Sequence, residues 1–144
     1  MAIKFMSQKS NILYTGKTRT TGGRNGESRS NDNRLDIKLS RPGSDDSGTN
    51  PEQLFAAGWS ACFIGAMDKA AQSLGIKLPA DTSIEAEIDL GNAKETGYFL
   101  RARLNVHVPG VDRSVAQTIA DLAHQICPYS KATRGNIEVA ITTV

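Results

Sequence analysis

Aromatic side chains and net charge are both scarce in this sequence, and their scarcity excludes one large class of proteins. Aromatic residues make up 6% of the 144 residues, and the formal net charge is +2 with both signs interspersed. A surface that binds nucleic acid usually carries a basic block with interleaved aromatic residues. The sequence has no such block, so we expect no nucleic-acid partner.

Long hydrophobic runs are also missing. The N-terminus lacks the apolar region of a signal peptide. The most apolar stretch, residues 54–67, is interrupted by Asp68 and Lys69 before it reaches the length of a membrane span. No stretch has the composition of a linker between domains. We therefore expect a cytoplasmic protein without a membrane partner, folded as a single domain over residues 1–144.

Cysteine and histidine occur only twice each, at Cys62, Cys127, His107 and His124. In a reducing compartment a static disulfide is not expected, which leaves a redox pair, a metal pair or two inert thiols. A metal site is disfavoured, because His124 should point away from the apolar face of its helix although its spacing to Cys127 suits a ligand pair. A cysteine hydrolase is disfavoured as well, because it needs a histidine base and both histidines are expected to face solvent.

The clearest element that is present is a helix over residues 50–75. Asn50 suits the N-cap, Pro51 suits the first helical position, and Gly75 supplies the stop. Residues 54–67 are nearly all apolar or small, which predicts burial on almost all sides of this half. Cys62 lies in the middle of that apolar half.

Alternating apolar residues predict five strands, and a second helix is predicted at 112–126, where Pro128 ends the regular helical pattern. The order is β-β-α-β-β-α-β, an α+β fold. The first two strands are expected to form a hairpin with Arg24 near its tip, in a glycine-rich turn. The strands are expected at residues 11–18, 34–40, 83–90, 98–108 and 136–144.

The chemistry that the residues favour is thiol redox chemistry at Cys62. A thiol buried in mid-helix should have a raised pKa and be inert unless a cation comes from elsewhere in the fold. Arg24 is a candidate for that cation, Glu52 for a carboxylate that orients it, and Cys127 for a resolving thiol. The residues alone leave the plainer interpretations open: two inert core thiols, a solvated arginine and a carboxylate that merely begins a helix.

Three segments carry a resemblance that goes beyond these patterns. They are N-P-E-Q-L-F-A-A-G-W-S-A-C-F-I-G-A (residues 50–66), C-P-Y-S-K-A-T-R-G-N-I-E-V (127–139) and T-G-G-R-N-G (21–26). They resemble the organic hydroperoxide resistance proteins of the OsmC/Ohr superfamily, which also holds the osmotically inducible proteins. The similarity spans nearly the whole chain. It implies the fold of that superfamily, with a long central helix and an intertwined homodimer.

The resemblance also implies an activity, that of an antioxidant thiol peroxidase which reduces organic and fatty-acid hydroperoxides to alcohols. It implies that Cys62 is the peroxidatic thiolate and that Cys127 resolves it as a disulfide. It further implies that Arg24 stabilises the thiolate and that Glu52 holds the arginine. No bound cofactor is implied, because electrons come from a lipoylated protein through its dihydrolipoyl group.

The apolar neighbours of Cys62 are expected to bind the alkyl or acyl tail of the substrate. Trp59 departs from the family, in which this position is usually tyrosine, and could reshape the pocket. The alternative function is a non-enzymatic ligand-binding domain with inert cysteines. The predicted tail-binding residues are Phe55, Trp59, Phe63, Ile64 and Met67.

Helix geometry adds a prediction about assembly. Glu52 and Cys62 are ten residues apart, so they lie roughly 15 Å apart along a straight helix. One Arg24 side chain with a hydrogen bond on either side spans only about 10 Å. The sequence therefore predicts a site shared between two chains, with Cys62 of one near Arg24 and Glu52 of the other. The competing explanation is a helix that bends or starts late, with Gly58 as the expected break.

Overall fold

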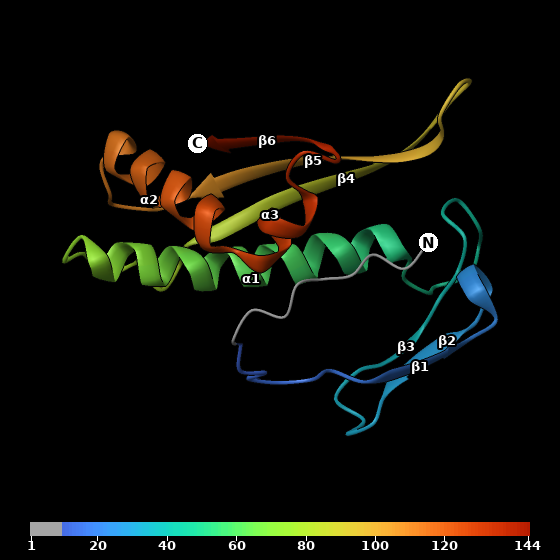
Figure 1. Ribbon diagram of the computed structural model, residues 1–144. Helices are drawn as coiled ribbons and strands as arrows, with labels where there is room; N and C mark the ends of the chain where they lie inside the picture. Colours follow the sequence, from blue (N-terminus) through green and yellow to red (C-terminus); the bar gives the residue numbers. More distant parts are fainter. Residues whose placement is uncertain (1–9) are drawn as a thin grey trace. The chain divides into compact units, whose positions relative to one another are not determined.

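The computed structural model describes residues 10–144, which form two compact units, residues 10–50 and Pro51–Val144 (Figure 1). The N-terminal unit is a small sheet, and the C-terminal unit combines a longer sheet with helices. Among the described residues, no helix has both the length and the apolar character to cross a membrane. A single folded domain over the whole chain stays a prediction.

The N-terminal unit contains three short antiparallel strands in the order β1 (Thr18–Thr21), β2 (Glu27–Ser30) and β3 (Asp36–Lys38). Arg24 lies in the 3-10 turn η1 (Gly23–Asn25) between β1 and β2, which confirms its predicted place at a hairpin tip.

The first predicted strand and the pairing of this hairpin were wrong, whereas the strand expected at 34–40 contains β3. The strand expected at 11–18 is irregular up to residue 17, and the partner of β1 is β2 rather than the strand at 34–40. The reason is that β2 reads E-S-R-S, in which only Ser28 is buried. Alternation of apolar and polar residues cannot reveal a strand that contains no apolar residue.

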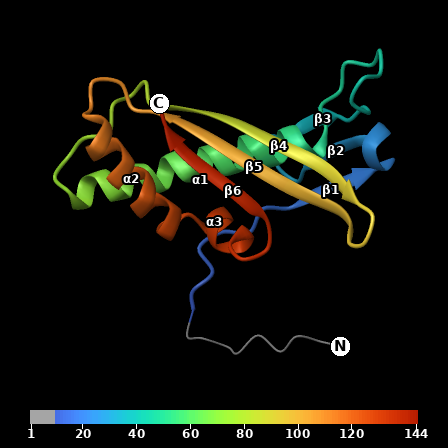
Figure 2. The same ribbon diagram turned by 90° about the horizontal axis from the view of Figure 1, so that it is seen from above.

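The C-terminal unit contains a sheet in the order β4-β5-β6, with the long helix α1 along one face and α2 beside it (Figures 1 and 2). Strands β4 and β5 are antiparallel, and β5 and β6 are parallel. The elements are α1 (Pro51–Ser73), β4 (Ser83–Ala93), β5 (Gly97–His107), α2 (Arg113–Ile126), α3 (Pro128–Thr133) and β6 (Glu138–Thr143).

Helix α1 begins and ends as its sequence predicts. Pro51 is its first residue, and Gly75 adopts a positive φ of 70° just beyond its end, which favours glycine. The helix runs unbroken through Gly58, so the break considered there does not occur.

Burial of α1 is less complete than its composition suggests. One face is fully buried against the rest of the unit at Trp59, Phe63 and Met67. The opposite face is exposed at Ala57, Ala61 and Gly65. The prediction of burial on almost all sides was therefore wrong for this chain, because the large side chains lie on one face and the small ones on the other.

The core of the C-terminal unit forms where α1 and α2 cover the sheet. Leu104 and Val106 of β5 are fully buried, as are Ile119 and Ala123 of α2. The predicted alternation in β5 fails only near its start, where Tyr98 is 78% exposed. Strand β6 pairs with β5 from Arg101 to Val106 only, so the start of β5 extends beyond the third strand.

The parallel pairing of β5 and β6 depends on a crossover through α2 and α3, as parallel neighbours require. Pro128 was expected to end helical structure, but α3 begins at this residue. Proline is disfavoured after a helical residue and well suited to the first position of a helix. Cys127 therefore stands at a corner, as the C-cap of α2 and the N-cap of α3, with an extended ψ of 123°.

Candidate functional site

The structure brings the two cysteines together although they are 65 residues apart in the chain. The Sγ atoms of Cys62 and Cys127 lie 3.6 Å apart, and both are free thiols. A disulfide bond is about 2.05 Å long, so the sulfurs need to approach by about 1.5 Å to join. This is within reach of small side-chain rotations, so the pair can carry dithiol–disulfide chemistry.

The two thiols differ in access. Cys62 is half-buried on α1, whereas Cys127 is fully buried. The backbone of Cys127 is held on both sides, because its N–H donates to Ala123 O at 2.8 Å and its C=O accepts from Lys131 N at 3.0 Å. The corner between α2 and α3 thus fixes the buried sulfur, and the more accessible sulfur comes from the long helix.

The surroundings of Cys62 favour its neutral form. Burial raises the pKa of the Cys62 thiol, and the neighbouring Cys127 sulfur raises it further, while the backbone N–H of Tyr129 opposes them. This direction agrees with the expectation for a thiol in a buried helix. A thiolate at neutral pH therefore needs an additional positive charge.

Aromatic side chains contact one another between α1 and α3, the helix that carries Cys62 and the helix that follows Cys127. The ring centroids of Phe55 and Trp59 are 5.5 Å apart in an edge-to-face arrangement, and those of Phe55 and Tyr129 are 6.1 Å apart. Trp59 Nε1–H donates to Ser130 Oγ at 3.3 Å, and both side chains are fully buried. These contacts join the helix of Cys62 to the short helix that follows Cys127.

Sequence reasoning assigned no role to Tyr129 or Ser130. Both lie in the C-P-Y-S segment, which was noticed only as part of a family resemblance. The available signal was Pro128, since a proline in the first helical turn predicts that Ser130 sits one turn beyond Cys127.

The five residues predicted to bind a substrate tail differ in exposure. Phe55 and Ile64 are partly exposed and lie on the same helix as Cys62. Trp59, Phe63 and Met67 are fully buried and belong to the core. A tail-binding role for these residues stays a prediction, and Phe55 and Ile64 are the two that an incoming molecule can reach in the described chain.

Arg24 and Glu52 lie in different units. Arg24 is partly buried in η1 of the N-terminal unit, and Glu52 is partly buried in the first turn of α1. Because α1 is unbroken, Glu52 and Cys62 are separated by about 15 Å of helical rise. Their predicted roles around a thiolate, and the predicted sharing between chains, stay predictions.

The histidines do not complete a metal cluster. Within residues 10–144, no group of three or more metal-binding side chains is close enough to hold an ion. His124 is half-buried rather than solvent-facing, and its Nδ1 has no hydrogen-bond partner in the described chain. Burial lowers the pKa of His124, and the nearby Arg134 guanidinium lowers it further.

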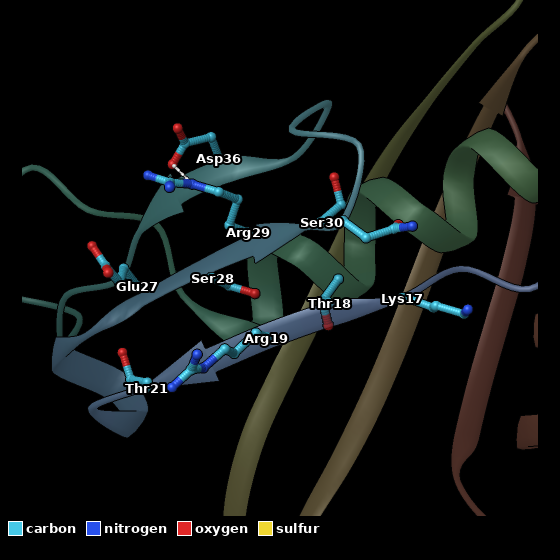
Figure 3. Close-up of a pocket in the computed structure, with 10 residues that line it drawn as sticks. Lys17, Thr18, Arg19, Thr21, Glu27, Ser28, Arg29, Ser30 and Asp36 are labelled. Atoms are coloured by element: carbon cyan, nitrogen blue, oxygen red, sulfur yellow. Dashed lines mark ion pairs between the residues drawn. The ribbon is translucent and has the colours of Figure 1, made fainter.

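The N-terminal unit has a hollow of its own on the β1–β2 side of its sheet (Figure 3). The Arg29–Asp36 ion pair at 3.4 Å crosses from β2 to β3 there, and both side chains are 59% exposed. The hollow mixes charges of both signs and contains no thiol. Its lining residues are Lys17, Thr18, Arg19, Thr21, Glu27, Ser28, Arg29, Ser30, Asn31 and Asp36.

Comparison with known proteins gives consistent matches. Residues 43–142 match the OsmC-like protein family. The organic hydroperoxide resistance protein of Xanthomonas axonopodis pv. citri (strain 306) is 48% identical over 141 residues, which cover 95% of this chain and 99% of that protein.

Solved structures agree with the sequence matches. The crystal structure of the organic hydroperoxide resistance protein OhrB of Bacillus subtilis superposes with a TM-score of 0.86 at 39% identity, covering 92% of this chain and 100% of that chain. An organic hydroperoxide resistance protein from Elizabethkingia anophelis gives a TM-score of 0.84 at 41% identity, over 93% and 98%. The predicted α+β fold is confirmed, and the chain belongs to the organic hydroperoxide resistance branch of the OsmC-like protein family.

Proposed function

We propose that this chain is a thiol peroxidase that reduces organic hydroperoxides, including fatty-acid hydroperoxides, to alcohols. Family membership supports the coarser statement, a peroxidase-type enzyme in organic hydroperoxide detoxification. The observation that carries the mechanism is the pair of free thiols, with the sulfurs 3.6 Å apart and only Cys62 accessible.

In the first step the Cys62 thiolate attacks the terminal oxygen of the hydroperoxide, and the O–O bond breaks. The alkoxide takes a proton and leaves as the alcohol, and Cys62 becomes a sulfenic acid. In the second step Cys127 attacks the sulfur of this sulfenic acid. An S–S bond forms, and the hydroxyl group leaves with the Cys127 proton as water.

The disulfide needs an external reductant, and we propose a dihydrolipoyl group carried by a lipoylated protein. One of its thiolates attacks a sulfur of the disulfide, and its second thiol then closes the lipoyl disulfide and frees both cysteines. Because Cys127 is fully buried, the attack is expected at Cys62, with the Cys127 sulfur as the leaving group.

The raised pKa of Cys62 means that the mechanism needs a cation. Each pKa unit of depression requires about 1.4 kcal/mol of preferential stabilisation of the thiolate. We assign this task to the Arg24 guanidinium, oriented by the Glu52 carboxylate. The length of unbroken helix between Glu52 and Cys62 supports a homodimer in which each site combines both chains. The exposed face of small residues on α1 would let a second helix approach closely.

Mixed dimers test the sharing. Cys62→Ser and Glu52→Ala chains are each expected to be impaired alone. In a shared arrangement one site of every heterodimer regains both groups, so activity returns on mixing. Heterodimers that form without recovering activity would place the three residues in one chain.

A dihydrolipoamide-coupled assay, run with cumene hydroperoxide and with hydrogen peroxide, tests the activity itself. We expect faster turnover with cumene hydroperoxide, because Phe55 and Ile64 offer partly exposed apolar surface on the helix that carries Cys62. The raised pKa of Cys62 favours the alternative, a ligand-binding domain with inert cysteines. That alternative predicts that both thiols remain reduced after one equivalent of hydroperoxide. Such an outcome would overturn the proposed peroxidase function.

A further inference from the structure

The buried hydrogen bond between Trp59 and Ser130 joins the same two segments of the chain as the thiol pair. Trp59 is three residues before Cys62 on α1, and Ser130 is three residues after Cys127 in α3. The Sγ–Sγ contact is 3.6 Å, and the Nε1–Oγ hydrogen bond is 3.3 Å. The two segments thus run in opposite directions past each other, joined at two neighbouring positions.

This hydrogen bond is costly to lose. Both side chains have 0% of their surface exposed, so water cannot replace either partner. When a buried donor loses its acceptor, the protein loses free energy of folding equal to the desolvation penalty of that donor, whereas an exposed donor can bond to water instead. The indole N–H of Trp59 therefore constrains where Ser130 can sit.

The short helix α3 needs such constraints from outside. It has six residues, from Pro128 to Thr133, and a helix of this length is not stable alone. Tyr129 adds further contacts with α1. Its hydroxyl lies so close to Gly58 that a Cβ added there would be only 3.1 Å from the oxygen, and its ring lies against that of Phe55. Contacts with α1 thus help to hold α3 and Cys127 in place, together with the hydrogen bond that joins the Cys127 N–H to Ala123 of α2.

We propose that Trp59 and Ser130 are positioning residues for the resolving step: they hold Cys127 close enough to Cys62 for the disulfide to close before a second hydroperoxide attacks. The inference rests on the proposed peroxidase function. Two reactions compete for the sulfenic acid. Cys127 attacks its sulfur and releases water, or the sulfenate attacks a second hydroperoxide, becoming sulfinic acid and releasing another alcohol. A looser Cys127 slows the first reaction and leaves the second unchanged.

Ser130→Ala is the primary test, because it removes the acceptor and adds no bulk. Purified protein is treated with increasing cumene hydroperoxide, and mass spectrometry measures the fractions of Cys62 as disulfide and as sulfinic acid. Loss of the first thiol in stopped-flow should stay within about twofold of wild type. The concentration that converts half of Cys62 to sulfinic acid should fall about tenfold, the size expected for one unsatisfied buried donor.

Thr133→Val is the matched control on the same helix. Its hydroxyl is also buried, but it donates only within α3, to Tyr129 O at 2.9 Å and Ser130 O at 3.2 Å. It should keep the wild-type ratio of disulfide to sulfinic acid. If Thr133→Val and Ser130→Ala were equally sensitive to overoxidation of Cys62, any loosening of α3 would be enough to slow disulfide formation. That result would overturn the specific role of Ser130.

Trp59→Phe provides a second route to the same bond from the other helix. Trp59→Phe should shift the ratio of disulfide to sulfinic acid in the same direction as Ser130→Ala. The variant with both changes should be no more sensitive to overoxidation than the more affected single variant, because both changes remove the same interaction. Independent, additive effects would contradict the proposal.

Two outcomes separate this inference from the proposed function. An unchanged ratio of disulfide to sulfinic acid in Ser130→Ala, while wild type forms the disulfide, would contradict this inference and leave the proposed function intact. A wild type that forms no Cys62–Cys127 disulfide would sink the proposed function.

Discussion

The two units of the chain differ in the length of their strands and in the size of their cores. The C-terminal unit has paired strands of 11 residues and a core in which Trp59, Phe63 and Leu104 are fully buried. The strands of the N-terminal unit have three or four residues, and Leu39 is the single buried apolar residue among those described there. The proposed disulfide between two sulfurs that lie 3.6 Å apart needs the first kind of scaffold, which holds both cysteines in place. A loop that supplies one charged side chain can be built on the second.

The largest expected effect tests where the chemistry lies. Cys62→Ser should abolish reduction of cumene hydroperoxide, a loss of about a thousandfold or more, because the proposed mechanism uses the Cys62 thiolate as the nucleophile. Serine is nearly isosteric, so circular dichroism and the melting temperature should stay close to those of wild type. Retained turnover in this variant would move the reaction away from the C-terminal thiol pair.

A stability comparison sharpens the contrast between the cores. Phe63→Ala should lower the free energy of unfolding by about 3–5 kcal/mol, because it leaves a cavity in a fully buried site. Ile37→Ala, at a half-buried position of β3, should cost less than about 2 kcal/mol. Urea unfolding at one fixed protein concentration measures both. Equal losses would show that the N-terminal sheet is as well supported as the C-terminal core.

Arg24→Met tests whether the N-terminal unit supplies the cation. Burial raises the pKa of Cys62, so without a compensating charge the thiolate forms only as the pH rises further. We expect a loss of about ten- to hundredfold at neutral pH, recovered in part as the pH is raised. The rate of Cys62 alkylation against pH measures this. A profile that matches wild type would exclude Arg24, and Arg24→Lys should be intermediate.

The smallest effects compare single carboxylates in the two units. Asp112 caps α2 by accepting from Ser114 N at 2.9 Å, so Asp112→Ala should lower the melting temperature by roughly a few degrees. Asp36→Asn removes the exposed pair with Arg29 and should change it by no more than about one degree.

The capping effect should depend on pH. The Ser114 hydroxyl and its backbone N–H hold the pKa of Asp112 below its usual value. The cap therefore stabilises the fold above the usual aspartate pKa and is lost as the pH falls through the lowered one. Melting curves at neutral and acidic pH should show the Asp112→Ala difference shrinking in acid. A difference that persists unchanged would mean that charge and capping contribute little there.

Sequence patterns predicted the elements that bury large apolar side chains. Strands β4 and β5 and helix α2 were located because periodicity reports burial, and helix α1 was located from its end signals and its apolar composition. Strand β2 was missed because its four residues carry no apolar side chain. Helix α3 was missed because Pro128 was interpreted only as an end, although proline also favours a beginning.

The candidate site was predicted less evenly. The residues alone made Cys127 only a candidate resolving thiol, and the resemblance assigned its pairing with Cys62, since nothing in the spacing of residues 65 apart indicates contact. The Trp59–Ser130 hydrogen bond joins residues 71 apart and has no signal in either segment alone. Such contacts depend on the crossover that returns the chain to β5, which is a property of topology rather than of local sequence.

The separation of the two cysteines has a consequence for heat resistance. A disulfide between them closes a loop of 65 residues, which removes many conformations from the unfolded chain. The loop-entropy estimate for this length is about 4 kcal/mol of added stability for the oxidised form. In the proposed mechanism each catalytic cycle alternates between a more and a less thermally resistant form, so the melting temperature would report the redox state of the two cysteines.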